Sequence, residues 1–409
     1  MARSKTDVRI LFCTRIVRLF AYGFLSVTLV LYLAELGIAA RVVGLLLTLA
    51  LLGDILISLA LTTSADRLGR RRVLVVGALL LVLAGTVFAI TGNVFLLAAA
   101  AIVGVVSPSG NEIGPFLSIE QAALSETTAD RKRTRVLAWY HLAGSLATAS
   151  GALLGGGFVQ ALQRAGFSEL ASYRFALLVY AAAGIALALL FLCLSPEVEA
   201  SRPTFTISKR RFGLHRSRNT VTKLSGLFAL DAFAGGFVIQ TLVAYWFYRR
   251  FGAEPMILGA IFFGSNALGG FSGLVAERLA ARIGLVNTLV FTHIPSNVLL
   301  MIVPFMPNLA SAIAVLLLRS SISQMDVPTR QSYTMAVVTP DERSAAAGVT
   351  TTARSIGALI SPVLSGQLFG SPLLMSTPFC LAGGLKIIYD LWLYRSFRKL
   401  RSPEEAVTR

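Results

Sequence analysis

Eleven ionisable side chains lie within the apolar stretches of this 409-residue sequence. A charge at the centre of a membrane helix costs roughly 2.5 to 3.5 kcal/mol, so eleven facing lipid would cost on the order of 30 kcal/mol. They must therefore pair with one another or line a watery cavity, where they can bind ions, protons or polar solutes. The bases are Arg15, Arg18, Arg319, Arg330, Arg354 and Lys386, and the acids are Asp54, Glu112, Asp231, Asp326 and Asp390.

Two of the apolar stretches are also interrupted. In 309–333, Arg319, Asp326 and Arg330 would share one stripe if the helix continued, but Pro328 breaks its hydrogen-bond ladder. In 94–117, Asn111 and Glu112 lie in a segment with two prolines and two glycines. Paired interruptions in corresponding places indicate a binding site. We expect Glu112 and Asp326 to line a polar path. The alternative is that the prolines only kink the helices and that the charges form structural ion pairs.

Three acids are candidates for a carboxylate that gains and loses a proton, because carboxyl groups in an apolar wall can change protonation near neutral pH. In order of preference they are Glu112, Asp231 and Asp54. Arg18 and Arg354 are candidate counter-ions or anion-binding groups.

The other charged and polar groups allow simpler interpretations. Lys386 and Asp390 are one helical turn apart and predict a packing pair, while Arg15 is close enough to the start of its stretch to reach the interface. His141 and His293 are expected to be hydrogen-bonded interior residues, and the polar run 292–297 could line the path.

No pattern of catalytic or cofactor-binding residues is present. We find no phosphate-binding glycine loop, no metal-ligand spacing and no nucleophile elbow. Cys13, Cys193 and Cys380 are isolated from one another, which argues against a disulfide framework or a zinc site. We expect no enzyme activity, no cofactor and no metal.

The elements that must position these charges are membrane helices. The sequence is 55% apolar and only 14% charged, with a mean hydropathy of +0.73, whereas soluble proteins are about 25% charged. A span of the bilayer needs about 20 helical residues. By that measure twelve spans are expected, at 10–35, 42–62, 73–92, 94–117, 136–159, 174–195, 224–247, 256–276, 285–306, 309–333, 345–369 and 376–394.

The basic residues predict the orientation of these spans. With the N-terminus inside, only Arg41, Arg164, Arg174, Arg249 and Arg250 of the basic residues between spans fall on the outer side. Both termini and the central loop 196–222 are therefore expected in the cytoplasm. The net charge of +17 reflects this topology rather than nucleic-acid binding, and the basic cluster 209–211 is expected to face anionic lipid headgroups.

The two halves of the chain resemble each other at an offset of about 210 residues. The segment 62–71 after the second span matches 273–282 after the eighth, Glu112 and Pro115 match Asp326 and Pro328, and 151–156 matches 361–366. The sequence therefore predicts an all-α protein of two six-helix bundles, residues 1–195 and 223–409, joined by the central loop.

With twelve spans, a basic central loop, this repeat and the segment Asp66-Arg-Leu-Gly-Arg-Arg-Arg72, the chain resembles the major facilitator superfamily. The resemblance implies two bundles that rock around a central cavity lined by spans 1, 4, 7 and 10. It also implies that Asp66 lies near the start of span 11, about Ala345. Together with Arg67, Gly69, Arg71 and Arg72, it would form a cytoplasmic latch that opens and closes.

Span 5 resembles the glycine motif of antiporters in this superfamily. Gly151, Gly155 and Gly156 match it, but Ala152 stands where proline is expected. Close helix packing is the simpler explanation of these glycines. The arginine that proton-driven exporters usually carry in span 4 is replaced by Val105 or Val106.

The resemblance implies a monomeric secondary transporter that moves a small solute by alternating access. We expect efflux by proton antiport across a bacterial inner membrane. The alternatives are metabolite uptake or uniport, and a non-transporting, receptor-like member of the fold. The sequence does not name the solute.

Overall fold

The computed structural model describes residues 2–110, 114–127, 130–199, 216–339 and 342–397. All regular secondary structure in these ranges is helical. The first part of the chain forms α1 (Ala2–Glu35), α2 (Ala40–Leu68), α3 (Arg70–Ile90), α4 (Val94–Val103), α5 (Phe116–Thr127), α6 (Asp130–Arg164), α7 (Glu169–Leu192) and the short η1 (Pro196–Val198). The basic cluster 209–211 lies outside the described residues.

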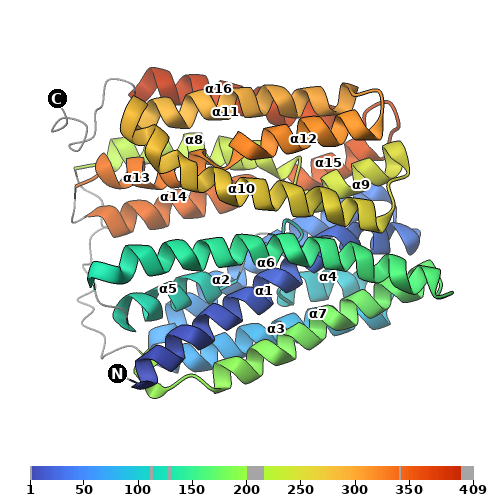
Figure 1. Cartoon of the computed structure of the whole chain (residues 1–409), viewed down its shortest axis with the longest axis horizontal. Coiled ribbons are helices and arrows are strands. Elements are labelled where there is room, and N and C mark those ends of the chain that lie inside the picture. The colour runs from blue at the N-terminus through green and yellow to red at the C-terminus, as the bar shows by residue number, and fades with distance from the viewer. Residues whose placement is uncertain (1, 111–113, 128–129, 200–215, 340–341, 398–409) are drawn as a thin grey trace. The chain divides into compact units, whose positions relative to one another are not determined.

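The later helices follow after the central loop. They are α8 (Arg218–Gly236), α9 (Gln240–Phe251), α10 (Pro255–Ile283), α11 (Leu285–Ile302), η3 (Val303–Phe305), α12 (Leu309–Ser323), α13 (Asp326–Ala336), α14 (Arg343–Ala358), α15 (Ser361–Phe369) and α16 (Thr377–Phe397). Figure 1 shows these helices along the chain.

Within the described residues, eight helices or joined helix pairs are long and apolar enough to cross a bilayer. They correspond to eight of the twelve expected spans. Three of the others are divided: span 4 into α4 and α5, span 10 into α12 and α13, and span 11 into α14 and α15. The last expected span is the continuous helix α16, which carries Lys386 and Asp390.

The helices group by packing into two compact units. The first contains residues 1–204 and 239–266, and the second contains 205–238 and 267–409, so α9 packs with the first unit and α10 is shared. This grouping reflects packing, and the division of the chain at the central loop stays a prediction.

In the first unit, α1 packs along α6 and α7, and α3 packs along α7 (Figure 1). Glycines allow the close approach of α6 to α1. A Cβ on Gly155 would lie 2.6 Å from the carbonyl oxygen of Phe24, and one on Gly151 would overlap the Phe20 carbonyl. Gly156 meets the backbone of Pro255 at the start of α10 in the same way. The three motif glycines therefore have a packing role.

The second unit has a corresponding helix contact, in which serine hydroxyl groups take the place of the glycines. α14 and α15 pack against α8, where the hydroxyl groups of Ser361 and Ser365 donate to the carbonyls of Phe233 and Phe237. Ser361 and Ser365 are the repeat partners of Gly151 and Gly155. A glycine thus approaches a backbone carbonyl in one unit, and at the corresponding position of the other unit a serine hydroxyl donates to a backbone carbonyl.

The predicted interruptions of spans 4 and 10 have different forms. After α4 the chain is non-helical through the described residues 104–110, and Gly110 and Gly114 have φ of +68° and +79°. In span 10 the helix ends at Ser323 and restarts at Asp326. Pro328 therefore lies in the first turn of α13, where a missing amide donor is tolerated, and the break precedes it.

Candidate functional site

Asp231 on α8 is the centre of a buried charge cluster in the second unit. Its carboxylate accepts hydrogen bonds from Lys386 of α16 at 2.6 Å, Arg354 of α14 at 2.9 Å and Arg330 of α13 at 3.1 Å. Asp231 is 2% exposed, whereas the side chain of Arg354 is 33% exposed. The carboxylate thus connects four helices, and Arg354 is the member of the set most open to its surroundings.

Asp326 extends this cluster. Arg330 also donates to Asp326, one turn before it, at 3.0 Å, and its guanidinium lies over the Phe228 ring at 5.6 Å from the centroid. Asp326 sits in the first turn of α13, where the helix dipole favours a negative charge. We call Asp231, Asp326, Arg330, Arg354 and Lys386 the Asp231 cluster.

Arg319 does not share the stripe expected for span 10, because the helix ends between it and Asp326. It lies on α12, and its Nε atom is buried with no hydrogen-bond partner among the described residues.

Asp390 has a different kind of partner. Its carboxylate is bonded to His293 Nδ1 at 2.8 Å and accepts from Asn297 Nδ2 at 3.2 Å, and all three residues are buried. Lys386 and Asp390, expected as a packing pair, each bind a residue of another helix instead. The polar run 292–297 thus supplies two hydrogen-bond partners to Asp390, namely His293 and Asn297.

The first unit has its own buried ion pair, between Arg18 of α1 and Glu120 of α5. The two guanidinium nitrogens donate to the two carboxylate oxygens at 2.8 and 2.7 Å, and both side chains are fully buried. The Thr14 hydroxyl donates to the same carboxylate at 2.8 Å, and the Tyr140 hydroxyl also donates to it. Arg18 is thus paired with Glu120, a carboxylate that the sequence analysis does not name.

Glu120 was missed because the expected fourth span ended at residue 117. The signal lay in the next turns: Phe116, Ile119, Ala123 and Leu124 form the buried face of α5, and Glu120 falls on that face, one turn after Phe116. A carboxylate on an apolar helix face predicts a buried partner.

Arg15 and His141 lie beside this pair. Arg15 is buried over the Tyr140 ring, 4.2 Å from its centroid. The sequence predicted instead that this side chain would extend to the membrane interface. Its guanidinium is 3.4 Å from His141 Nδ1, and His141 Nε2 is 3.2 Å from Gln121. His141 is hydrogen-bonded as predicted, but the residue is exposed and not in the interior of the first unit.

Asp54 supports the broken part of span 4. Its carboxylate accepts from the backbone N–H of Gly114 at 2.5 Å and from the Ser58 hydroxyl at 3.1 Å. Asn111 and Glu112, which precede Gly114, lie outside the described residues.

The predicted latch segment belongs to two helices joined by a turn. Gly69, with φ of +96°, is the residue between α2 and α3. The Glu199 carboxylate accepts from the backbone N–H groups of Arg70 at 2.6 Å and Arg71 at 3.3 Å, so it caps α3. Arg72 is exposed, and the side chains of Asp66 and Arg67 are outside the described residues.

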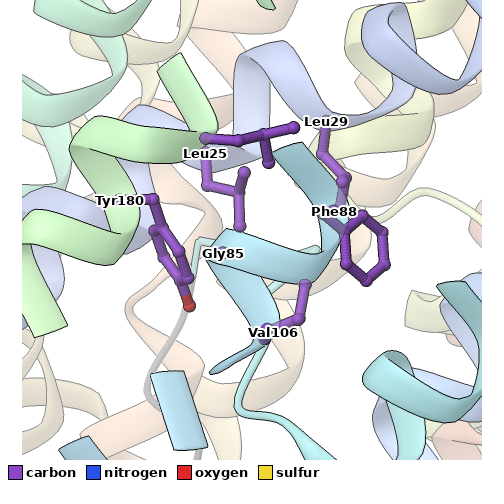
Figure 2. A pocket seen from close by; sticks show the side chains of 8 residues that line it. Leu25, Leu29, Gly85, Phe88, Val106 and Tyr180 are labelled. Carbon is purple, nitrogen blue, oxygen red and sulfur yellow. The ribbon is translucent and has the colours of Figure 1, made fainter. Parts of the chain in front are cut away.

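An apolar crevice in the first unit contrasts with these polar sites. It leaves no room for a water molecule and is lined by α1, α3, α7 and Val106 of the segment after α4. Figure 2 shows Leu25, Leu29, Phe88 and Tyr180 around it. Because its lining carries no charge, the candidate site is assigned to the ion pairs. No cluster of metal-ligating side chains occurs among the described residues.

The chain is 29% identical over 420 residues to the uncharacterized membrane protein YJR124C of Saccharomyces cerevisiae, covering 95% of this chain and 94% of the relative.

Solved structures share the fold. A bacterial homologue of the human lysosomal transporter Spinster, in an inward-facing and occupied conformation, has a TM-score of 0.74 at 16% identity, covering 98% of this chain and 99% of that one. A D-xylose-proton symporter has a TM-score of 0.74 at 14% identity, covering 95% and 97%.

The family profile of the Major Facilitator Superfamily matches residues 11–362, most of the chain. With its helical units and buried charges, this integral multi-pass membrane protein belongs to the major facilitator superfamily of transporters.

Proposed function

We propose that this transporter exports a small solute by alternating access in exchange for protons. The observation that supports it best is the Asp231 cluster. One buried carboxylate holds three cations from three further helices, and such a set can be rearranged only by moving those helices or by changing its charge.

Proton exchange requires that the bound proton and the bound solute exclude each other. A carboxylate at membrane depth that is linked to mobile helices can enforce this, because its partners differ between its charged and neutral forms. Asp231, Asp54 and Glu112 remain the sequence-based candidates for this carboxylate. In this proposal Arg18, Arg319, Arg330, Arg354 and Asn111 border the solute path.

The latch segment and the glycines complete the proposal. Asp66, Arg67 and Arg71 would hold the cytoplasmic ends of the two bundles together, while Gly151, Gly155 and Gly156 keep span 5 close to its neighbours. We place both termini in the cytoplasm and the protein, as a monomer, in the plasma membrane, on the distribution of Lys and Arg.

Everted membrane vesicles test the exchange. After acidification of the lumen, addition of a substrate should release protons and restore the fluorescence of acridine orange. The panel comprises organic anions, organic cations, sugars and nucleosides. Antiport predicts proton release by at least one compound, abolished in Asp231→Asn and retained in the control Glu35→Gln, whose side chain is exposed.

Uptake is the competing function. If an active compound enters right-side-out vesicles together with protons, the direction is uptake by symport; if flux is independent of the pH gradient, it is uniport. If no compound of the panel moves, the exchange proposal is contradicted and the receptor-like alternative gains support.

A further inference from the structure

We propose that Asp390, with His293 and Asn297, forms a proton-binding site distinct from the Asp231 cluster, and that it is the carboxyl group that exchanges the coupled proton. The second part rests on the proposed proton exchange. The first part concerns proton binding alone and can be tested without transport.

The first argument is the charge of the partners. Asp231, Asp326 and Glu120 each face a guanidinium or ammonium group, so a proton on any of them would leave a permanent buried cation without its partner. Breaking a buried pair in this way is strongly unfavourable. Asp390 instead contacts His293 at 2.8 Å, and a histidine can be neutral or charged near neutral pH. This pair can change its number of protons without stranding a fixed charge.

The second argument is the amide of Asn297. Its Nδ2 donates to the ionised carboxylate of Asp390, while its Oδ1 is buried with no hydrogen-bond partner among the described residues. If the amide rotates by half a turn, Oδ1 can accept the O–H of a protonated Asp390. No other described hydrogen bond of this amide is lost, so Asn297 can serve both protonation states.

The third argument is the position of the pair relative to the Asp231 cluster. Asp390 is one turn from Lys386 on α16, and Lys386 binds Asp231 at 2.6 Å. A change of charge at Asp390 therefore acts on the ion pair that connects α16 to α8. The site is fully buried, and a Cβ on Gly383 would lie 2.8 Å from the Asn297 carbonyl, so α16 and α11 are in close contact here.

The charged and titratable groups around the site come from five packed helices. They are His293 of α11, Lys386 and Tyr389 of α16, Asp231 of α8, and Asp326, Arg330 and Tyr333 of α13, while α12, also packed on α11, carries Arg319. Of these, His293 is the group bonded directly to the Asp390 carboxylate and able to share its proton.

Proton counting on the purified full-length protein tests the site directly. In weakly buffered detergent solution, the protons taken up between about pH 8 and pH 5 are measured for each variant, over the range in which histidine titrates. We expect Asp390→Asn to bind one proton fewer than the natural chain. His293→Gln should shift the pH at which the remaining proton binds. Asp326→Asn, a matched loss of a buried carboxylate held by Arg330, should leave the count unchanged.

The result that overturns the site is an equal proton count in Asp390→Asn and the natural chain. A fall in the count of Asp326→Asn as well would also overturn it, because the loss would not be specific to Asp390. Thermal unfolding of each variant shows that the fold is retained. If Asp390→Asn misfolds, His293→Gln decides: an unshifted proton-binding curve contradicts the proposal.

The coupling role has a separate readout in the acridine orange vesicles. Asp390→Asn should lose substrate-driven proton release by at least tenfold. If the natural chain releases protons and this variant does so equally, the coupling role fails while the proposed exchange stands. If the natural chain releases none, the exchange fails while the proton count still tests the site.

Discussion

Arg18 and Glu120, 102 residues apart in the sequence, form a bidentate ion pair, and both side chains are fully buried. The pair joins α1 to α5, and the hydroxyl groups of Thr14 and Tyr140 complete the hydrogen bonding of the carboxylate. The Glu120 carboxylate thus accepts four hydrogen bonds, two of them from Arg18, which makes the pair sensitive to the removal of either partner.

We expect Glu120→Gln to destabilise the protein by about 3 to 5 kcal/mol, because it leaves the Arg18 charge buried without its counter-ion. Thermal unfolding in detergent measures the effect. The double variant Arg18→Met with Glu120→Gln should recover part of the loss. Equal stability of Glu120→Gln and the exposed control Glu35→Gln would show that the pair is not a structural ion pair.

Asp231 and Lys386 should be energetically coupled. In a double-mutant cycle of Asp231→Asn and Lys386→Gln, the double variant should be more stable than the sum of the single effects predicts, by about 0.5 to 3 kcal/mol. The reason is that Asp231→Asn leaves Lys386 buried beside Arg330 and Arg354 without their shared carboxylate, and Lys386→Gln then removes one of these repelling cations. Additive effects would contradict the 2.6 Å contact.

The repeat partners Gly151 and Ser361 should respond differently to alanine. Gly151→Ala forces a Cβ against the Phe20 carbonyl and should cost about 1 to 3 kcal/mol. Ser361→Ala loses a hydrogen bond to Phe233, which in membrane helices is worth about 0.6 kcal/mol. Unfolding midpoints of the two variants measure the difference, and a larger loss for Ser361→Ala would reverse the packing argument.

Within the first unit, Gln240 of α9 donates to the Ser26 hydroxyl of α1 at 2.7 Å. If α9 separates from α1 during alternating access, a link between these positions should stop transport. We expect a Ser26→Cys/Gln240→Cys chain without other cysteines to lose proton release when a short thiol cross-linker is added. Each single variant should keep its activity with the same reagent, and an active cross-linked protein would exclude this separation.

Periodicity and composition predicted most of the fold, because membrane helices are specified by local apolar runs. Sequence spacing also placed Asp326 and Arg330 one turn apart, and in the structure they form an ion pair within one helix. It did not predict the partners of Asp231 or Asp390, since those come from helices more than 90 residues away. Such pairings depend on how helices rotate and cross, which no local pattern encodes.

The breaks in the spans were predicted more reliably than their positions. Pro328 indicated an interruption of span 10, but the helix ends at Ser323, before the proline. Proline is compatible with a first turn, so it marks the restart of the helix as readily as its end. Glu120 was overlooked for a related reason: a fixed span length hid the helix that resumes after the break in span 4.

Water accessibility at the break in span 10 tests most directly whether the buried charges border a hydrated passage. Gln324, at the break, and Leu318, on the preceding helix α12, are both exposed in the structure. In a chain without other cysteines, a membrane-impermeant thiol reagent should label Gln324→Cys from at least one face of sealed vesicles. It should leave Leu318→Cys unlabelled, because we expect this exposed apolar position to face lipid. Protection of Gln324→Cys from both faces in every condition, to the same degree as Leu318→Cys, would contradict the account.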